Sequence, residues 1–96
     1  SMVSLPTLEV GWIKERINMI YSLLESSMRC AIKREENINE DGSINWNFVD
    51  ADAYWTCSEF FKDSEAFYEV FDEIAKDIDS ERTSVETAEQ LEFVLH

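Results

Sequence analysis

The first recurring pattern of apolar positions covers the N-terminal third of the chain. From Val10 to Ala31 apolar residues return every three or four positions, which predicts an amphipathic helix. Thr7 is its expected cap, and the helix covers residues 8–36 if it is unbroken. A thinner apolar stripe lies beside the main one, so the helix offers apolar surface to more than one neighbour. The main stripe is Val10, Ile13, Ile17, Ile20, Leu24, Met28 and Ala31, and the second is Trp12, Met19, Leu23 and Cys30.

The expected length of this helix constrains the fold. A helix over residues 8–36 is about 43 Å long at about 1.5 Å per residue, whereas a compact chain of 96 residues is about 32 Å across. The helix therefore either breaks at Ser26-Ser27 or protrudes and meets another copy. We favour protrusion and a homodimer formed through this helix.

Two more helices are predicted after a polar loop. Asp50 is the expected cap of a second helix that runs through Phe61, and Asp63 or Ser64 is the expected cap of a third. Each of them has one apolar face. The buried face of the second helix is expected to be Val49, Ala53, Cys57, Phe60 and Phe61, and that of the third Phe67, Val70, Phe71, Ile74 and Ile78.

The C-terminal region supports more than one assignment. The polar segment "DIDSERTS", residues 77–84, is predicted to be a connector, and Thr83 with Glu86 forms a capping box for a last helix. The segments "LEFVL" and "INWNF" alternate as strands do, so a small two-stranded pairing stays open. The predicted fold class is all-α, a small antiparallel bundle of about four helices with one long N-terminal helix. Residues 1–6 are expected to be a disordered tail, with Ser1 an expression remnant, and residues 7–96 a single helical domain.

Charge changes this picture more than any other compositional feature. The net charge is −13, and it belongs to one part of the chain, because residues 1–39 hold five acids and five bases whereas residues 40–96 hold sixteen acids and three bases. Such a segment repels nucleic acid and anionic lipid and attracts basic proteins. No apolar run suits a membrane span, and the N-terminus lacks the features of a secretion signal. The two cysteines fit a reducing compartment, with a single bridge as the alternative, so a cytoplasmic location is predicted.

The segment "NINEDGSINWNF", residues 37–48, resembles a helix–loop–helix calcium site in its spacing. Oxygen-bearing side chains and Gly42 stand at suitable positions, but Asn37 takes the first position, where a carboxylate is needed, and Phe48 takes the twelfth. Among the side chains at the ligand positions, only Asp41 is charged. We therefore predict a turn at Asp41-Gly42, with no metal site and no cofactor.

The residues needed for common catalytic sites are missing from the sequence. His96 is the only histidine and the last residue, and no glycine-rich loop is present to cradle a phosphate. The sequence therefore predicts that the chain is not an enzyme.

The predicted function is a non-catalytic acidic protein-binding module, an inhibitor or immunity-type protein or a nucleic-acid mimic. Its partner is a basic protein, such as a nucleic-acid-binding enzyme or a toxin, held by the acidic face of the helices in residues 50–79. Trp55 either anchors this interface or covers the core, and the sequence leaves both open. The alternative is a homodimeric assembly module that uses the wide apolar face of the helix over residues 8–36. The predicted partner-binding residues are Asp52, Trp55, Glu59, Glu65, Glu69, Asp72, Glu73 and Asp77.

Overall fold

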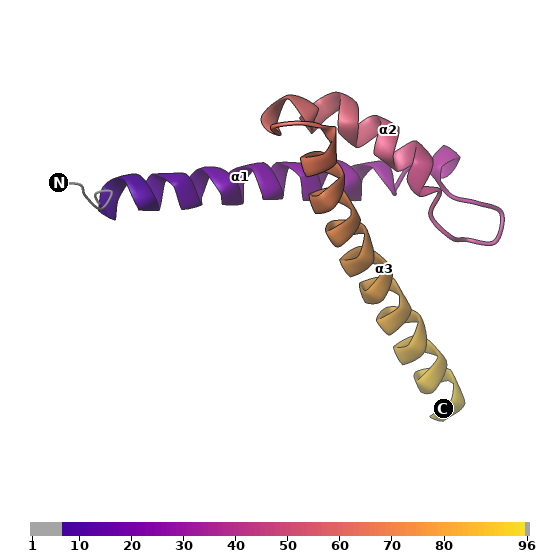
Figure 1. Cartoon of the computed structure of the whole chain (residues 1–96). Coiled ribbons are helices and arrows are strands. Elements are labelled where there is room, and N and C mark those ends of the chain that lie inside the picture. The colour runs from indigo at the N-terminus through magenta and orange to yellow at the C-terminus, as the bar shows by residue number, and fades with distance from the viewer. Residues whose placement is uncertain (1–6, 96) are drawn as a thin grey trace.

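The structure, a computed structural model, describes residues 7–95 and is built from three helices (Figure 1). They are α1 (Thr7–Ala31), α2 (Trp46–Cys57) and α3 (Ser64–Leu95), and two short 3₁₀ turns, η1 (Glu35–Asn37) and η2 (Ser58–Phe60), lie between them. The all-α prediction is confirmed for the described residues. The strand pairing that the sequence left open does not form, because residues 91–95 belong to α3 and α2 begins at Trp46. The described residues contain one isolated antiparallel bridge, between Ile38 and Ile44. The expected tail and His96 lie outside the described residues.

The predicted bundle of about four helices is not confirmed, because the two long helices diverge instead of lying side by side. α2 lies along the C-terminal half of α1, and α3 passes this pair and then leaves it (Figure 1). The radius of gyration is 17.9 Å, whereas a compact chain of this length is expected at about 12.5 Å. The principal extents are 66 × 32 × 18 Å, so the molecule is elongated.

The hydrophobic core sits where the three helices meet. The predicted inner faces are confirmed for most positions, and Phe60 is the exception, because the chain changes to the 3₁₀ turn η2 at Ser58 and carries Phe60 out to an exposed position. The core therefore depends on one third of α1, all of α2 and the first half of α3. Its buried residues are Leu24, Met28, Ala31, Ile44, Val49, Ala53, Cys57, Phe67, Phe71, Ile74 and Ile78.

α1 is continuous and protrudes, as predicted. It passes through Ser26-Ser27 without a break and ends at Ala31, five residues before the predicted end at Glu36. At this end the carbonyl oxygen of Ala31 accepts two hydrogen bonds, from Asn37 Nδ2 at 2.8 Å and from the backbone N–H of Arg34 at 3.1 Å. These bonds satisfy one of the carbonyls in the last turn, which lack α-helical partners.

The predicted cap of α3 is correct, whereas those of α1 and α2 are wrong. Asp63 caps α3, because its Oδ1 accepts a hydrogen bond of 2.9 Å from the backbone N–H of Ala66. Thr7 is already the first residue of α1. Asp50 does not cap α2, which already begins at Trp46 with Asn45 in the cap position. The second predicted helix therefore starts five residues earlier than expected, and Asp50 lies inside it.

The predicted connector at residues 77–84 and the last helix after it are wrong, because α3 runs through them without interruption. The hydroxyl of Thr83 donates to the carbonyl oxygen of Asp79 at 3.0 Å, and that of Ser84 donates to the carbonyl of Ser80 at 3.0 Å. Hydroxyl residues are satisfied inside a helix by such bonds one turn back. The Thr83 side chain is therefore used within α3 instead of capping a new helix with Glu86.

Candidate functional site

The most distinctive polar feature of the described residues is a row of carboxylates on α3. This helix carries ten acidic and two basic residues. Four of the acids follow one another at i, i+4 spacing, so they form one line along the helix, about 18 Å long. We call this line the acidic row; it consists of Glu65, Glu69, Glu73 and Asp77.

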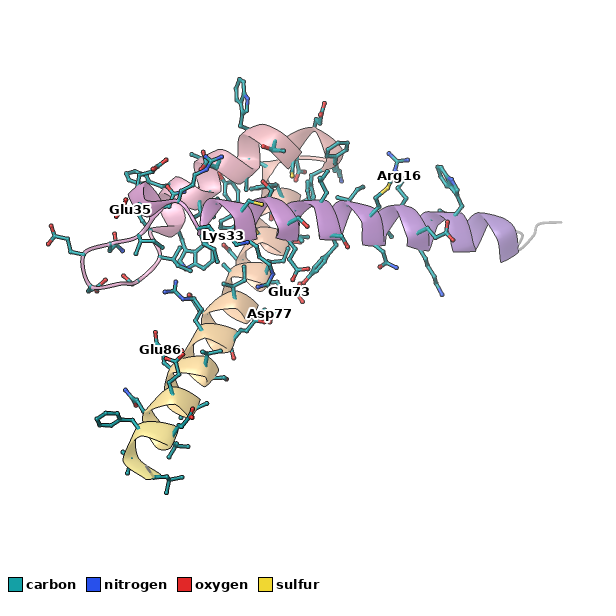
Figure 2. The ribbon with its side chains drawn as sticks, turned by 180° about the vertical axis from the view of Figure 1, so that it is seen from behind. Arg16, Lys33, Glu35, Glu73, Asp77 and Glu86 are labelled. Atoms are coloured by element: carbon teal, nitrogen blue, oxygen red, sulfur yellow. The ribbon has the colours of Figure 1, made fainter. Side chains whose placement is uncertain are left out.

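The acidic row is exposed and makes no ion pair or hydrogen bond with any residue in the described part of the chain. Asp72, beside the row, has the same properties. Figure 2 shows Glu73 and Asp77 on α3 close to the place where it passes α1. Their field extends across that crossing: the pKa of Tyr21 on α1 is raised, first by desolvation and then by the charges of Asp77 and Glu73. The row is thus a concentrated negative surface that the fold itself does not neutralise.

Trp55 is an exposed side chain, so the alternative that it covers the core is wrong, and its role as an interface anchor stays a prediction. It is 90% exposed and stands on the outer side of α2. Beside it lies a groove of about 490 Å³ between α1 and α2, lined also by Cys30, Arg34 and Thr56 among others. An exposed tryptophan at the edge of a groove is a residue type that commonly anchors protein interfaces.

The structure does not bring the eight predicted partner-binding residues onto one surface. Asp52 lies at the Trp55 groove, where its Oδ2 accepts hydrogen bonds from Arg34 at 3.1 Å and from Asn37 at 3.3 Å, so its charge is already balanced. Glu59 belongs to η2, and no residue of α3 lines the groove.

The reason for this division is the way α2 and α3 pack. They contact through aromatic side chains on their inner faces, with Tyr54 against Phe67 at 5.1 Å between ring centroids. Their outer faces therefore point away from each other. The predicted site separates into the acidic row with Asp72 on α3, and Trp55 with Asp52 on α2.

The loop at residues 37–48 forms a turn, as predicted. Asp41 Oδ1 accepts hydrogen bonds from the Ser43 N–H at 3.0 Å and from its hydroxyl, and these bonds hold the pKa of the Asp41 carboxyl below its usual range. Gly42 has a φ of 87°, a conformation that glycine adopts without strain. Asn37 is buried and its amide faces Ala31 and Asp52, so it is turned away from any loop centre. Within residues 7–95 no group of three or more histidine, cysteine or acidic side chains is placed to hold a metal ion.

The two cysteines are free, and the alternative of a bridge between them is wrong. Cys57 is buried, and this burial raises the pKa of its thiol, which is the environment of a small apolar core residue. Cys30 is exposed at the Trp55 groove. No helix within residues 7–95 combines the length and the apolar character that crossing a bilayer requires.

Asp50 has a role that sequence reasoning missed. Its Oδ2 accepts a hydrogen bond from the hydroxyl of Tyr68 at 3.2 Å, which joins α2 to α3. This bond is the largest of the causes that raise the pKa of Tyr68, followed by desolvation and by the charge of Asp50. The helical spacing of both residues was visible in the sequence, but the approach of the two helices was not.

The raised pKa of Tyr68 can be measured. We expect Tyr68 to ionise at higher pH than an ordinary tyrosine, and Asp50→Asn to move its pKa back towards the ordinary value. Because the folded-state pKa is raised, the stabilisation is present below the ordinary tyrosine pKa and is lost as pH rises through the folded-state value. Tyrosinate absorbance during alkaline titration, with Tyr68→Phe to assign the signal, reports this shift. Glu40→Gln, remote from the ring, is the control, and an identical titration in Asp50→Asn and Glu40→Gln would contradict the assignment.

The molecule exposes apolar side chains at both ends; those on the protruding α1 were predicted, whereas those on α3 were missed. On α1 these include Trp12, Ile13, Ile17 and Met19, and on α3 Val85, Leu91, Phe93, Val94 and Leu95. The signal for α3 was available, since Val85 continues the i, i+3/i+4 spacing of Phe71, Ile74 and Ile78.

Comparison of the chain with models of protein families, with curated proteins and with solved structures finds no match.

Proposed function

We propose that the protein is a non-catalytic interaction module that binds a basic protein through the acidic row and Asp72 on α3. The observation that carries the proposal is the concentration of unneutralised charge: five exposed carboxylates lie within residues 65–77, and Lys76 is the one base of α3 in that range. A surface of this kind supports a role as an inhibitor, an immunity-type protein or a nucleic-acid mimic, all of which meet a basic site on their target.

The internal energetics of α3 favour a role in binding over a role in folding. Like charges at i, i+4 on a helix repel each other by about 0.2–0.5 kcal/mol per pair, and the acidic row contains three such neighbouring pairs. The row therefore opposes the stability of the helix that carries it. A basic partner removes this repulsion, and the same charges steer its approach and speed association.

The proposed binding through charged side chains is expected to depend on ionic strength. Charges on an exposed helix are screened over about 10 Å at 0.1 M salt and about 3 Å at 1 M salt. We therefore expect binding through the acidic row to weaken steeply with salt. Trp55 lies on a different surface, so it is a separate contact and not part of the binding site proposed for α3.

The test is capture of proteins from a nuclease-treated lysate of the source cell, at low and at high salt. Three baits are compared: the natural chain; a row variant with Glu69→Gln, Glu73→Gln and Asp77→Asn; and a matched variant with Glu35→Gln, Glu36→Gln and Glu40→Gln. Both variants lose three negative charges, but the second set lies in η1 and the adjacent loop. Because neutralising the row removes like-charge repulsion, the row variant is expected to be no less stable than the natural chain.

The expected result is a basic protein that the natural chain and the matched variant retain at low salt and release at high salt. The row variant should lose it. If both variants lose the captured protein equally, net charge alone determines the binding. If all three baits retain it equally, the binding does not use the acidic row, and either result contradicts the proposal.

A second candidate function, self-association as an assembly module, is favoured by a different observation. The apolar face of α1 continues beyond the core without cover, and Ile17 on it is 60% exposed. This candidate needs neither the acidic row nor a basic partner.

A further inference from the structure

Two helical segments of the molecule extend beyond the hydrophobic core. We call residues 7–20 of α1 the N-terminal arm and residues 82–95 of α3 the C-terminal arm. The arms diverge from the place where α1 and α3 cross, and each projects alone (Figure 1). Ile20 and Arg82 are the last half-buried residues, and the described side chains outward of them are exposed.

The exposed area is larger than a chain of this size normally leaves in water. The accessible surface is 7541 Å², whereas a folded monomer of 11.2 kDa is expected to expose roughly 5,700 Å². The excess of about 1,800 Å² per chain corresponds to about 3,700 Å² for a pair, which lies in the range of obligate homodimer interfaces. The surplus area is therefore large enough for an interface with a second copy of this chain.

Part of this surplus is apolar and continues the core. Ile13 and Ile17 extend the buried line of Leu24 and Met28 along α1, and Val85, which is 53% exposed, extends the line of Ile78 along α3. Isolated helices shorter than about 12–15 residues are marginal in water. Each arm is about this length and continues a packed helix, so a neighbour along its apolar side chains would add to its stability.

The two arms differ in charge. Lys14 and Arg16 flank the Ile13–Ile17 line of the N-terminal arm, and Arg16 also lies over the Trp12 ring at 5.8 Å. Glu15 falls on the opposite side of the helix. With Glu9 and Glu15 the N-terminal arm is neutral overall, whereas the C-terminal arm carries Glu86, Glu89 and Glu92 against Arg82. Two C-terminal arms laid together would bring glutamates against glutamates, whereas an N-terminal arm offers them partners.

From these observations we propose that the protein forms a two-fold symmetric homodimer in which each N-terminal arm packs along the C-terminal arm of the other copy. A two-fold axis that bisects the angle between the two arms places the partner's N-terminal arm along the C-terminal arm of the first copy. Each N-terminal arm then runs antiparallel to the partner's C-terminal arm, and both unpacked helices of each copy are covered. The inference rests on the self-association candidate and is independent of the acidic row, which lies inward of the C-terminal arm.

The last half-buried residue of each arm gives a register for the proposed contact. Counted from these residues, Ile17 and Val85 are both three positions outward, so the proposed register opposes them. Arg16 and Glu86 are both four residues outward, and Lys14 lies one residue out of step with Glu89. The apolar pair and both charge pairs agree with one register.

The first measurement is sedimentation velocity of the purified chain over a wide range of concentrations. The expected result is a species of twice the chain mass that dissociates on dilution. A chain that stays monomeric throughout, or that grows into assemblies larger than a pair, overturns the proposal.

A charge exchange then identifies which arms meet. Lys14→Glu with Arg16→Glu is expected to raise the dimer dissociation constant at least about tenfold, because acids then oppose acids. Glu86→Lys with Glu89→Lys is expected to weaken the dimer as well. The chain that carries all four substitutions should dimerise as the natural chain does, since each N-terminal arm again meets a C-terminal arm of opposite charge. All four positions are exposed, and far-UV circular dichroism verifies that each variant keeps its helices.

Each outcome of the exchange decides the question. Recovery of the dimer in the fourfold variant supports contact between the N-terminal arm and the partner's C-terminal arm. A dimer that all the variants leave unchanged uses another surface, and a dimer that the fourfold variant does not restore joins like arms. Either of these results overturns the inference, while the capture experiment on the acidic row remains unaffected.

Discussion

Replacing Phe67 by alanine is expected to lower the free energy of unfolding by about 3–5 kcal/mol. Phe67 is completely buried at the start of α3, and its ring contacts four others. The ring centroids of Tyr54, Phe61, Tyr68 and Phe71 lie at 5.1, 5.4, 5.1 and 5.8 Å from its own. Such aromatic pairs contribute about 0.5–1.5 kcal/mol beyond the area that they bury. Because these rings come from α2, from the residue after η2 and from α3, the substitution removes contacts that join α2 to α3.

Chemical denaturation followed by circular dichroism measures this loss, and Phe48→Ala provides a matched control. Phe48 stands on α2 with 54% of its surface exposed, so the same truncation leaves no cavity there and should cost less than about 1 kcal/mol. A domain of this size has a total stability of about 5–14 kcal/mol. Phe67→Ala should therefore bring the protein close to unfolding. Equal losses in the two variants would show that the aromatic cluster is not the centre of the core.

The core could be predicted from the sequence because its signal is local. The inner faces of α2 and α3 follow from the spacing of Val49, Ala53 and Cys57 and of Phe67, Phe71 and Ile74, and the structure confirms them. The length of α1 left two alternatives, a break at Ser26-Ser27 or a protrusion, and the structure shows the protrusion. What the spacing could not supply was the angle between helices, which long-range packing sets. The predicted bundle failed for that reason.

The candidate site was predictable residue by residue but not as a surface. A helical wheel shows that Trp55 points away from Ala53, but only the arrangement of α1 and α3 decides whether another element covers it. The same holds for Asp52, whose partners Arg34 and Asn37 come from a segment well before it in the chain. The acidic row needed no such information, because i, i+4 positions on one helix are always neighbours.

The largest error concerned residues 77–84, where polar composition indicated a connector. An exposed helix and an exposed connector have the same composition, so contacts elsewhere decide between them. Here the chain is held by residues that are distant in sequence: Glu81 accepts a hydrogen bond from Arg29 at 2.9 Å, and Arg82 donates one to the carbonyl oxygen of Gly42 at 2.9 Å. Neither contact can be inferred from local pattern.

Replacing Ser80 by proline tests the continuity of α3 directly. Proline in a helix interior removes a backbone hydrogen bond and its ring clashes with the preceding turn, at a cost of about 3 kcal/mol. Ser80 is exposed and lies in the middle of α3, two residues after the buried Ile78. We therefore expect Ser80→Pro to lose about 3 kcal/mol of unfolding free energy relative to Ser80→Ala, together with part of the helical signal.

Ser80→Ala is the appropriate reference because it removes the same hydroxyl and keeps the backbone N–H. Alanine is the better helix former, so this variant should equal or slightly exceed the natural chain in stability. If residues 77–84 formed a connector, proline at position 80 would instead be tolerated, and the two variants would unfold alike. We also expect Ser80→Pro to weaken the proposed dimer. A C-terminal arm that no longer continues α3 cannot reach the partner's N-terminal arm, so a variant that is both destabilised and monomeric would support both the continuous α3 and the proposed contact.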